Sequence, residues 1–249
     1  MTEPAAATAL RDSRNRPLDC VAVALDTSDR PRFDAWCRTF GPRVGLLKVG
    51  LEAYVRWGPA AVETARAHAR GVFLDLKLHD IPNTVAGAVA AARDLGANLL
   101  TVHAAGATSM LLAAVEAARG EVGLLAVTLL THLDEAALAE LDISGEIAPR
   151  AGRWAELAKR AGCAGAVCSP HETAALRARL APPFLLVTPG VRPQGSDAGD
   201  QRRVTTPAAA LAAGADYLVI GRPLTGAADP GAALAALERE LAESAHPSH

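Results

Sequence analysis

Short apolar runs alternate with longer, alanine-rich stretches along most of the chain. Continuous apolar runs bounded by turn residues are typical of parallel strands that are buried on both faces. We therefore expect strands at Val21–Leu25, Val44–Val49, Gly71–Leu76, Leu99–His103, Val122–Val127, Gly165–Cys168, Phe184–Val187 and Tyr217–Ile220.

The stretches between these runs favour helices, because alanine has the highest helix propensity. The candidates are Arg32–Thr39, Gly58–Ala69, Thr84–Leu95, Ser109–Arg119, Arg153–Ala161, His171–Leu180, Pro207–Ala213 and Pro230–Ala242. Eight strand–helix units predict an α/β fold, the single-domain (β/α)8 TIM barrel, over residues 18–244. A doubly wound open sheet is the structural alternative. Residues 1–17 and 245–249 lack an apolar core and are expected to be flexible tails.

Composition and charge exclude several classes of partner. Of the 249 residues, 50% are hydrophobic, and the formal net charge is −2 with both signs interspersed, which argues against nucleic-acid binding and against an anionic membrane surface. No apolar run reaches the roughly 18 residues of a spanning helix. The four cysteines form no CxxC pair and the histidines have no ligand spacing, so we expect core thiols, a cytoplasmic location and no metal site.

The run from Asp75 to Thr84, DLKLHDIPNT, carries the strongest chemical signal. Alternate strand residues share a face, so Asp75 and Lys77 point the same way, and Asp80 follows just past the strand. A buried ion pair adds little net stability, whereas catalysis needs charges fixed in a water-poor pocket. If this motif stood alone, a structural ion pair at a strand end would be the alternative to a catalytic role.

Polar residues follow most of the predicted strands. In a barrel these positions converge at one end, where the active site lies. They include Asp26, Lys48, Asp75, Lys77, His103, Thr131, Arg192 and Arg222. Lys48 by itself could be a lysine that snorkels at a strand end. Together with Asp75, Lys77 and Asp80, however, it makes an alternating network that would keep every member charged.

Two segments near the C-terminus favour an anion. The polar, Gly- and Pro-rich segment after the seventh strand resembles a lid and offers Arg192 and Gln201 as donors, although a solvated surface loop is the alternative. The turn at Gly221 and Arg222 opens a helix directly after the eighth strand, in the usual phosphate position of barrels. We therefore expect a phosphorylated small molecule as ligand.

In order along the chain, these motifs resemble the orotidine 5′-phosphate decarboxylase family. The matching segments are Ala-Leu-Asp26, Leu-Lys48-Val-Gly, the Asp75–Thr84 run, Thr-Val-His103-Ala, Leu-Leu-Thr131, Thr-Pro-Gly-Val-Arg192-Pro, Gly-Asp-Gln201-Arg-Arg and Ile-Gly221-Arg222-Pro. The resemblance spans nearly the whole predicted domain. It implies decarboxylation of orotidine 5′-phosphate to UMP and CO2, the last step of UMP biosynthesis, without a cofactor or metal.

The resemblance also implies a role for each matching residue. Asp26 and Lys48 would hold the ribose, Lys77 would protonate the pyrimidine C6, and Asp75 would lie beside the departing carboxylate. Thr131 would lie near the base, and Arg192, Gln201, Gly221 and Arg222 would grip the phosphate. In a homodimer, Asp80 and Thr84 would reach the partner's site, with Ile81 also contacting substrate.

Two departures and two rivals accompany this interpretation. Many bacterial members have Leu-Thr-Ser where this chain has His132 after Thr131, and the usual glycine pair is Gly106-Ala107 here. Related barrels that share DxKxxD, such as 3-keto-L-gulonate 6-phosphate decarboxylase and hexulose-phosphate synthase, would depend on magnesium. A catalytically silent nucleotide-binding protein is the rival from another class. The role of His103, as a general acid or base or as a packing residue, stays open.

Overall fold

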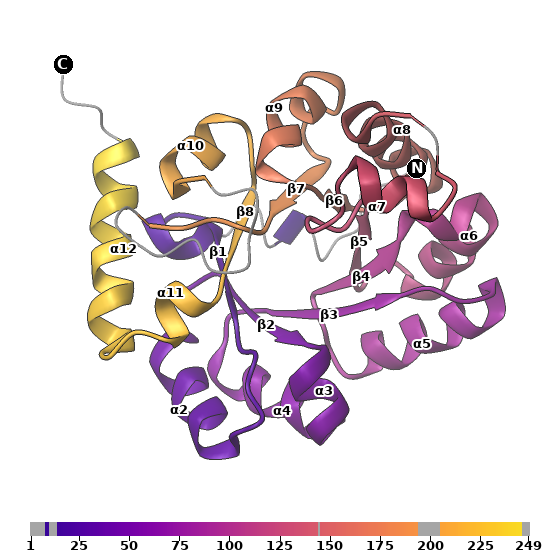
Figure 1. The fold of residues 1–249 in the computed structure, drawn as a ribbon. Helices are drawn as coiled ribbons and strands as arrows, with labels where there is room; N and C mark the ends of the chain where they lie inside the picture. The colour runs from indigo at the N-terminus through magenta and orange to yellow at the C-terminus, as the bar shows by residue number, and fades with distance from the viewer. Residues whose placement is uncertain (1–7, 10–13, 144, 194–204, 246–249) are drawn as a thin grey trace.

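The computed structural model describes residues 8–9, 14–143, 145–193 and 205–245. Its strands pair in parallel and in sequence order, and β8 closes on β1 (Figure 1). The strands of this closed barrel are β1 (Val21–Ala24), β2 (Leu46–Gly50), β3 (Val72–Leu78), β4 (Leu99–His103), β5 (Gly123–Val127), β6 (Gly165–Val167), β7 (Leu185–Thr188) and β8 (Tyr217–Ile220). The closed order confirms the (β/α)8 barrel and excludes the open doubly wound sheet.

Helices surround the barrel on its outside (Figure 1). They are α2 (Arg30–Phe40), α3 (Leu51–Trp57), α4 (Pro59–His68), α5 (Pro82–Asp94), α6 (Ala107–Ala118), α7 (Glu135–Glu140), α8 (Ile147–Ala161), α9 (Pro170–Arg179), α10 (Pro207–Ala212), α11 (Arg222–Thr225) and α12 (Pro230–Ala245), with the 3-10 turns η1 (Pro17–Cys20) and η2 (Ala104–Gly106). Proline at the start of several of them supplies a fixed φ where no N–H donor is needed.

Each predicted strand lies within two residues of the observed one, and Leu99–His103 and Tyr217–Ile220 agree at both ends. The sequence interpretation missed α3 and α7, which span seven and six residues and are too short for a helical period to stand out. The helix expected to open at Gly221 and Arg222 is present as α11. It also began α8 at Arg153, whereas the helix begins at Ile147.

Side chains that alternate along the strands divide between two cores. Outward-facing residues such as Val23, Leu47 and Leu74 are buried against the helices. Inward-facing residues fill the barrel interior: Ala22, Leu46, Phe73, Leu99, Leu125, Ala164, Leu185, Val187 and Tyr217. Because the side-chain period of a strand is two, the next inward positions after Leu46, Phe73 and Leu99 are Lys48, Asp75 and Thr101. The interior thus changes from apolar to charged toward the carboxyl ends of the strands.

The amino end of the barrel carries a separate charge cluster around Asp19. The Asp19 carboxylate, 2% exposed, accepts hydrogen bonds from the Asn15 and Arg16 N–H groups, both at 2.9 Å, and from the guanidinium groups of Arg16 and Arg70. Burial is the largest influence on the pKa of Asp19 and raises it, but the bonds from Arg16 and Asn15 outweigh burial and lower the pKa. This cluster fixes η1 at the start of β1.

The segment before residue 18 is also held against this end of the barrel. Arg14 donates to the Asp216 carbonyl at 2.7 Å, and its guanidinium lies 5.4 Å from the centre of the Tyr217 ring. Arg14 therefore contacts the barrel although it lies a few residues before the domain boundary expected from the sequence.

Candidate active site

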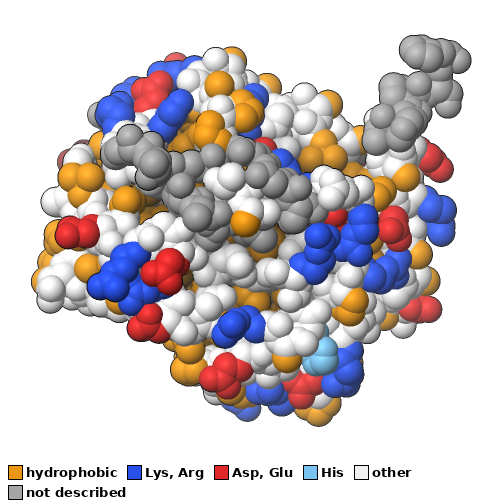
Figure 2. Space-filling model, turned by 180° about the vertical axis from the view of Figure 1, so that it is seen from behind, with side chains coloured by type: hydrophobic (Ala, Val, Ile, Leu, Met, Phe, Trp, Pro, Cys, Tyr) orange, Lys and Arg blue, Asp and Glu red, His pale blue; other side chains and the backbone are white. Residues whose placement is uncertain are grey.

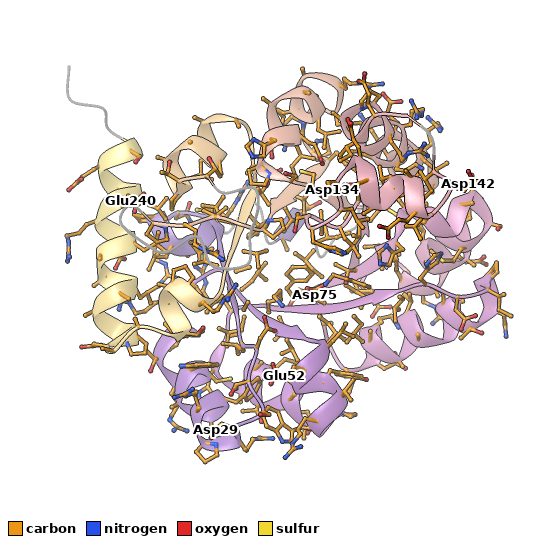
Figure 3. All side chains as sticks on the ribbon, in the orientation of Figure 1. Asp29, Glu52, Asp75, Asp134, Asp142 and Glu240 are labelled. Atoms are coloured by element: carbon orange, nitrogen blue, oxygen red, sulfur yellow. The ribbon has the colours of Figure 1, made fainter. Side chains whose placement is uncertain are left out.

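A cavity of about 370 Å³ opens at the carboxyl ends of the strands. Its walls come from the ends of several strands and from the loops after β5, β7 and β8: Ala24, Asp26, Lys48, Phe73, Asp75, Lys77, Val127, Leu129, Leu130, Thr131, Val167, Pro189, Gly190, Arg192, Val219, Gly221 and Arg222. Among the acidic residues labelled in Figure 3, Asp75 lies at the centre of the barrel, whereas Asp29, Asp142 and Glu240 lie on its outside. The cavity is where a barrel enzyme holds its substrate.

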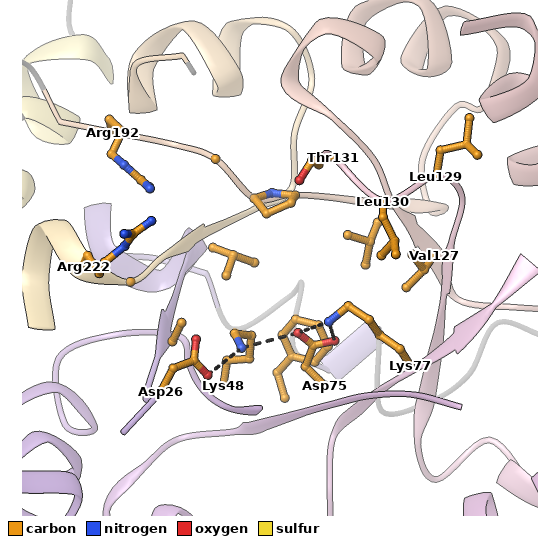
Figure 4. Close-up of a pocket in the computed structure, with 17 residues that line it drawn as sticks. Asp26, Lys48, Asp75, Lys77, Val127, Leu129, Leu130, Thr131, Arg192 and Arg222 are labelled. Carbon is orange, nitrogen blue, oxygen red and sulfur yellow. Dashed lines mark hydrogen bonds and ion pairs between the residues drawn. The ribbon is translucent and has the colours of Figure 1, made fainter. Parts of the chain in front are cut away.

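Two lysines and one aspartate form the charged floor of this cavity (Figure 4). Lys77 Nζ lies 2.8 and 2.9 Å from the two carboxylate oxygens of Asp75, and Lys48 Nζ lies 3.4 Å from Asp75 Oδ2. The side chains of Lys48, Asp75 and Lys77 are 8%, 13% and 31% exposed. Lys77 is therefore the cation of this cluster that is most open to a ligand.

The surroundings of Asp75 keep it ionised. Burial has the largest effect and raises its pKa, but the charges of Lys48 and Lys77, with hydrogen bonds from Lys77 and Thr101, together lower the pKa below the ordinary value. The carboxylate is thus a fixed negative charge beside an ammonium group inside a partly desolvated cavity.

The backbone at Lys77 adopts the left-handed conformation, with φ of 51°. For a residue other than glycine this costs about 1–2 kcal/mol, and such strain is often found at functional sites. The pairing of β3 with β4 is irregular at the same place, because Leu74 pairs with Leu100 but Leu78 pairs with Val102. Strand irregularities of this kind redirect side chains near active sites.

A further ion pair connects the floor to the end of β1. Lys48 Nζ lies 3.4 Å from Asp26 Oδ1, and Asp26 is exposed to the cavity mouth. A Cβ atom at Gly50 would lie 2.5 Å from Asp26 Oδ1 and 2.9 Å from Lys48 Nζ, so a side chain there would displace the charged ends of this pair. The glycine lets two hydrogen-bonding side chains approach the backbone at the start of α3.

Two arginines lie on another side of the cavity from Lys77. Figure 4 shows the guanidinium groups of Arg192 and Arg222 on one side and the Lys77–Asp75 pair across from them, with Thr131 on the upper wall. Arg192 is 8% exposed and donates to the Val191 carbonyl at 3.0 Å, whereas Arg222 is exposed at the first position of α11. The cavity therefore has a cationic end separated from its lysine–aspartate floor.

Three predicted site residues do not line this cavity in the single chain. Asp80, Ile81 and Thr84 are exposed at and just before the start of α5, and Asp80 Oδ1 accepts from the Ile81 N–H at 2.6 Å. Asp80 and Ile81 line a different, shallow hollow. The predicted four-member network is thus a three-member cluster within one chain. Gln201 lies outside the described residues.

The histidines near the site differ in exposure. His103 is half-buried with its ring centre 5.3 Å from that of His79, and burial, followed by the nearby His79 and Lys77 charges, lowers the pKa of His103. Neither ring lines the cavity. His132 is exposed and does not line the cavity either, whereas Thr131 beside it is part of the wall.

The sequence interpretation missed two features of the site. One is Thr101, which is fully buried and hydrogen-bonded to both Asp75 and Lys77. The other is the apolar part of the wall, from Phe73, Val127, Leu129, Val167 and Val219. The signal for Thr101 was the alternation of inward positions along Leu99–His103, which places residue 101 beside the charges of β3.

Within the described ranges, no three His, Cys, Asp or Glu side chains are grouped as metal ligands. Nor does any described helix have both the length and the apolar character that crossing a membrane needs. Figure 2 shows acidic and basic side chains intermixed over the face opposite to that of Figure 1. Cys37, Cys163 and Cys168 are buried thiols and Cys20 is partly buried, in line with the expected core thiols.

The fold and the cavity together define a β/α-barrel protein with a lysine–aspartate cluster and a separate arginine pair. The model of the orotidine 5′-phosphate decarboxylase / HUMPS family matches residues 19–237, and the chain belongs to this family.

Known relatives agree with this assignment over most of the chain. An orotidine 5′-phosphate decarboxylase of Thermobifida fusca is 55% identical over 222 residues, which cover 89% of this chain and 95% of the relative. One from Anaeromyxobacter sp. strain K is 53% identical over 226 residues, 91% of this chain and 100% of the relative. The crystal structure of the Lactobacillus acidophilus decarboxylase superposes with a TM-score of 0.79 at 34% identity, covering 91% and 99% of the two chains.

Proposed function

We propose that this protein is a carboxy-lyase that converts orotidine 5′-phosphate to UMP and CO2, the last step of UMP biosynthesis. The observation that carries the proposal is the cavity with Lys77 and Asp75 on its floor and Arg192 and Arg222 at another side. A nucleoside monophosphate fits this arrangement, with its phosphate at the two arginines and its reacting ring at the Lys77–Asp75 pair. The identity of more than half to the Thermobifida fusca relative supports the same substrate.

The reaction leaves an electron pair on the pyrimidine C6 with no neighbouring carbonyl to accept it. When the bond between C6 and the carboxylate breaks, CO2 departs and the pair stays on C6. The Lys77 ammonium lies within the cavity to stabilise this charge, and then donates a proton to form the C6–H bond of UMP. Asp75, which remains ionised, would lie beside the departing carboxylate and keep the lysine ammonium in place.

The remaining cavity residues bind and orient the substrate in this account. Asp26 and Lys48 would hold the ribose hydroxyls, Thr131 would contact the base, and Arg192 and Arg222, with the Gly221 backbone, would bind the phosphate. Gln201 would add a phosphate contact. Enzymes lower barriers by about 8–23 kcal/mol, and binding energy from a remote phosphate can supply part of this. The chemistry needs no metal or cofactor.

We further propose that two chains form a homodimer in which Asp80, Ile81 and Thr84 complete the partner's site. All three are exposed, and none of them lines the cavity of its own chain. Ile81 is 66% exposed, and Val55 and Leu51 on α3, which follows the adjacent strand β2, are 81% and 50% exposed, so the segments after β2 and β3 carry apolar surface suited to burial. A cytoplasmic location fits the unpaired thiols.

The substrate is tested by incubating the purified protein with orotidine 5′-phosphate, with and without EDTA. Sugar phosphates of the rival barrels, tested with and without magnesium, serve as the comparison. Loss of orotidylate absorbance that resists the chelator supports the proposal. Turnover of a sugar phosphate only with magnesium would contradict it, and nucleotide binding without turnover would indicate a silent binder.

The shared site is tested by mixing two inactive variants, Lys77→Ala and Asp80→Ala. If Asp80 serves the partner's cavity, each mixed dimer has one site with both changes and one with neither. Random exchange then restores about a quarter of the wild-type activity. If Asp80 serves its own cavity, mixing restores nothing, and if it serves no cavity, Asp80→Ala is already active before mixing.

A further inference from the structure

The hydroxyl group of Thr101, on β4, contacts both members of the Lys77–Asp75 pair. Thr101 Oγ1 accepts a hydrogen bond from the Lys77 backbone N–H at 2.8 Å and donates one to Asp75 Oδ1 at 2.9 Å. The two bonds are compatible, because a hydroxyl has one proton to donate and lone pairs to accept. The side chain is fully buried and has no contact with the cavity surface.

This contact occurs where β3 leaves the regular strand ladder. The register between β3 and β4 shifts between Leu74 and Leu78, so the backbone of Lys77 is not paired in the ordinary way. Lys77 also has the left-handed φ of 51°. A buried N–H at such a position needs a partner other than the neighbouring backbone, and the threonine hydroxyl supplies it.

We propose that Thr101 is a positioning residue for the decarboxylation proposed above. One hydroxyl holds the left-handed turn that carries the Lys77 ammonium, and it fixes the orientation of the carboxylate to which that ammonium is bonded. Thr101 acts through these two residues and does not touch the substrate. Misplacing a reacting group by about 1 Å can lower a rate by roughly 10²-fold.

The electrostatic surroundings of Asp75 come from several elements. Lys48 faces it from β2, Lys77 from its own strand, and Thr101 from β4; Asp26 contacts Lys48, and His103 lies farther along β4 beside His79. The hydroxyl bond stabilises the ionised form of Asp75. Its loss should therefore raise the pKa of Asp75 and move the acidic limb of the kcat/KM profile to higher pH.

The test compares Thr101→Val, which keeps the shape and removes the hydroxyl, with Thr101→Ser, which keeps the hydroxyl. Thr173→Val is the matched control, since this buried threonine on α9 bonds to the Ser169 carbonyl and the Thr188 hydroxyl instead. We expect Thr101→Val to lower kcat about 10–100-fold with KM changed less than about threefold. Thr101→Ser should stay within about threefold of wild type, as should Thr173→Val.

Two results would overturn the proposal. One is a Thr101→Val enzyme with wild-type kcat and an unchanged acidic limb. The other is a Thr101→Ser enzyme as impaired as Thr101→Val, which would assign the effect to packing. The pKa of Asp75, followed by NMR in protein carrying ¹³C-labelled aspartate, tests the positioning without turnover. A raised pKa in Thr101→Val supports the contact even if orotidine 5′-phosphate proves not to be the substrate, and an unchanged pKa contradicts it.

Discussion

Each end of the barrel holds an aspartate with two cations, buried at the amino end and partly buried at the carboxyl end, and the two clusters differ in their partners and in the space beside them. At the amino end, Asp19 is bound by two arginines and two backbone N–H groups. At the carboxyl end, Asp75 is bound by two lysines and the Thr101 hydroxyl, and it faces a cavity of about 370 Å³. The same charge arrangement can therefore serve structure at one end and chemistry at the other.

The choice of cation explains part of this difference. Arginine does not release its proton in proteins and holds carboxylates in a fixed geometry, whereas a lysine ammonium can transfer a proton. The positive φ of Lys77 adds a second difference, because backbone strain is present at the carboxyl-end cluster. Asp19 instead takes part in a capping interaction at η1. We therefore expect substitutions at the carboxyl end to lower kcat/KM and substitutions at the amino end to lower the free energy of unfolding.

The largest effect is expected for Asp75→Asn. The amide removes the negative charge between Lys48 and Lys77 and so misplaces the Lys77 ammonium, and we expect kcat/KM to fall at least about 10³-fold. Steady-state assays with orotidine 5′-phosphate measure the loss. A decrease of less than tenfold would mean that the Asp75 cluster, like the Asp19 cluster, is not needed for catalysis.

Arg222→Ala should weaken the grip on the phosphate. Loss of a hydrogen bond to a charged group costs about 1.5–3 kcal/mol, which corresponds to a decrease in kcat/KM of roughly 10–150-fold. Isothermal titration with UMP measures the binding part of this effect, and uridine, which lacks the phosphate, is the control ligand. If Arg222→Ala weakened the binding of UMP and of uridine equally, the phosphate would not bind at Arg222.

Asp19→Asn should reduce stability by about 2 kcal/mol and leave kcat/KM within about twofold, because it weakens charge-assisted bonds far from the cavity. The pKa of Asp19 is lowered in the folded protein, so its contribution is present above the ordinary value of 3.8 and is lost as the pH falls through the lowered folded value. The difference in unfolding free energy between wild type and variant should therefore narrow below about pH 3.8. Urea titrations at pH 7 and at pH 3 measure it, and a constant or widening difference would contradict the assignment.

The smallest effect is expected for His132→Ser, which introduces the serine that the resemblance leads us to expect after Thr131. Because His132 is exposed and outside the cavity wall, the change should alter both kcat/KM and the free energy of unfolding by no more than about 0.5 kcal/mol. A tenfold change in KM for orotidine 5′-phosphate would show that the imidazole reaches the base.

Sequence reasoning could predict the barrel and the charged part of the cavity wall, because both follow from the order of strands and strand ends along the chain. Each apolar run marks a strand, and the charged residue that ends it must lie at the carboxyl end of the barrel, as Lys48 and Asp75 do. The Asp19 cluster was not predicted, since Arg16 and Arg70 are far apart in sequence and meet only when the strand order is known. The left-handed backbone conformation of Lys77 could not be predicted either, because residues other than glycine, asparagine and aspartate rarely adopt a positive φ.

We propose the Lys77 ammonium as the proton donor and principal cation of the site, so Lys77→Ala is the decisive variant. The measurement is kcat/KM for orotidine 5′-phosphate in EDTA, beside wild type and Asp19→Asn. We expect a loss of at least about 10⁴-fold for Lys77→Ala, since proton donation and charge stabilisation disappear together, with near-normal turnover for Asp19→Asn. Turnover by Lys77→Ala within tenfold of wild type would rule out this role for Lys77.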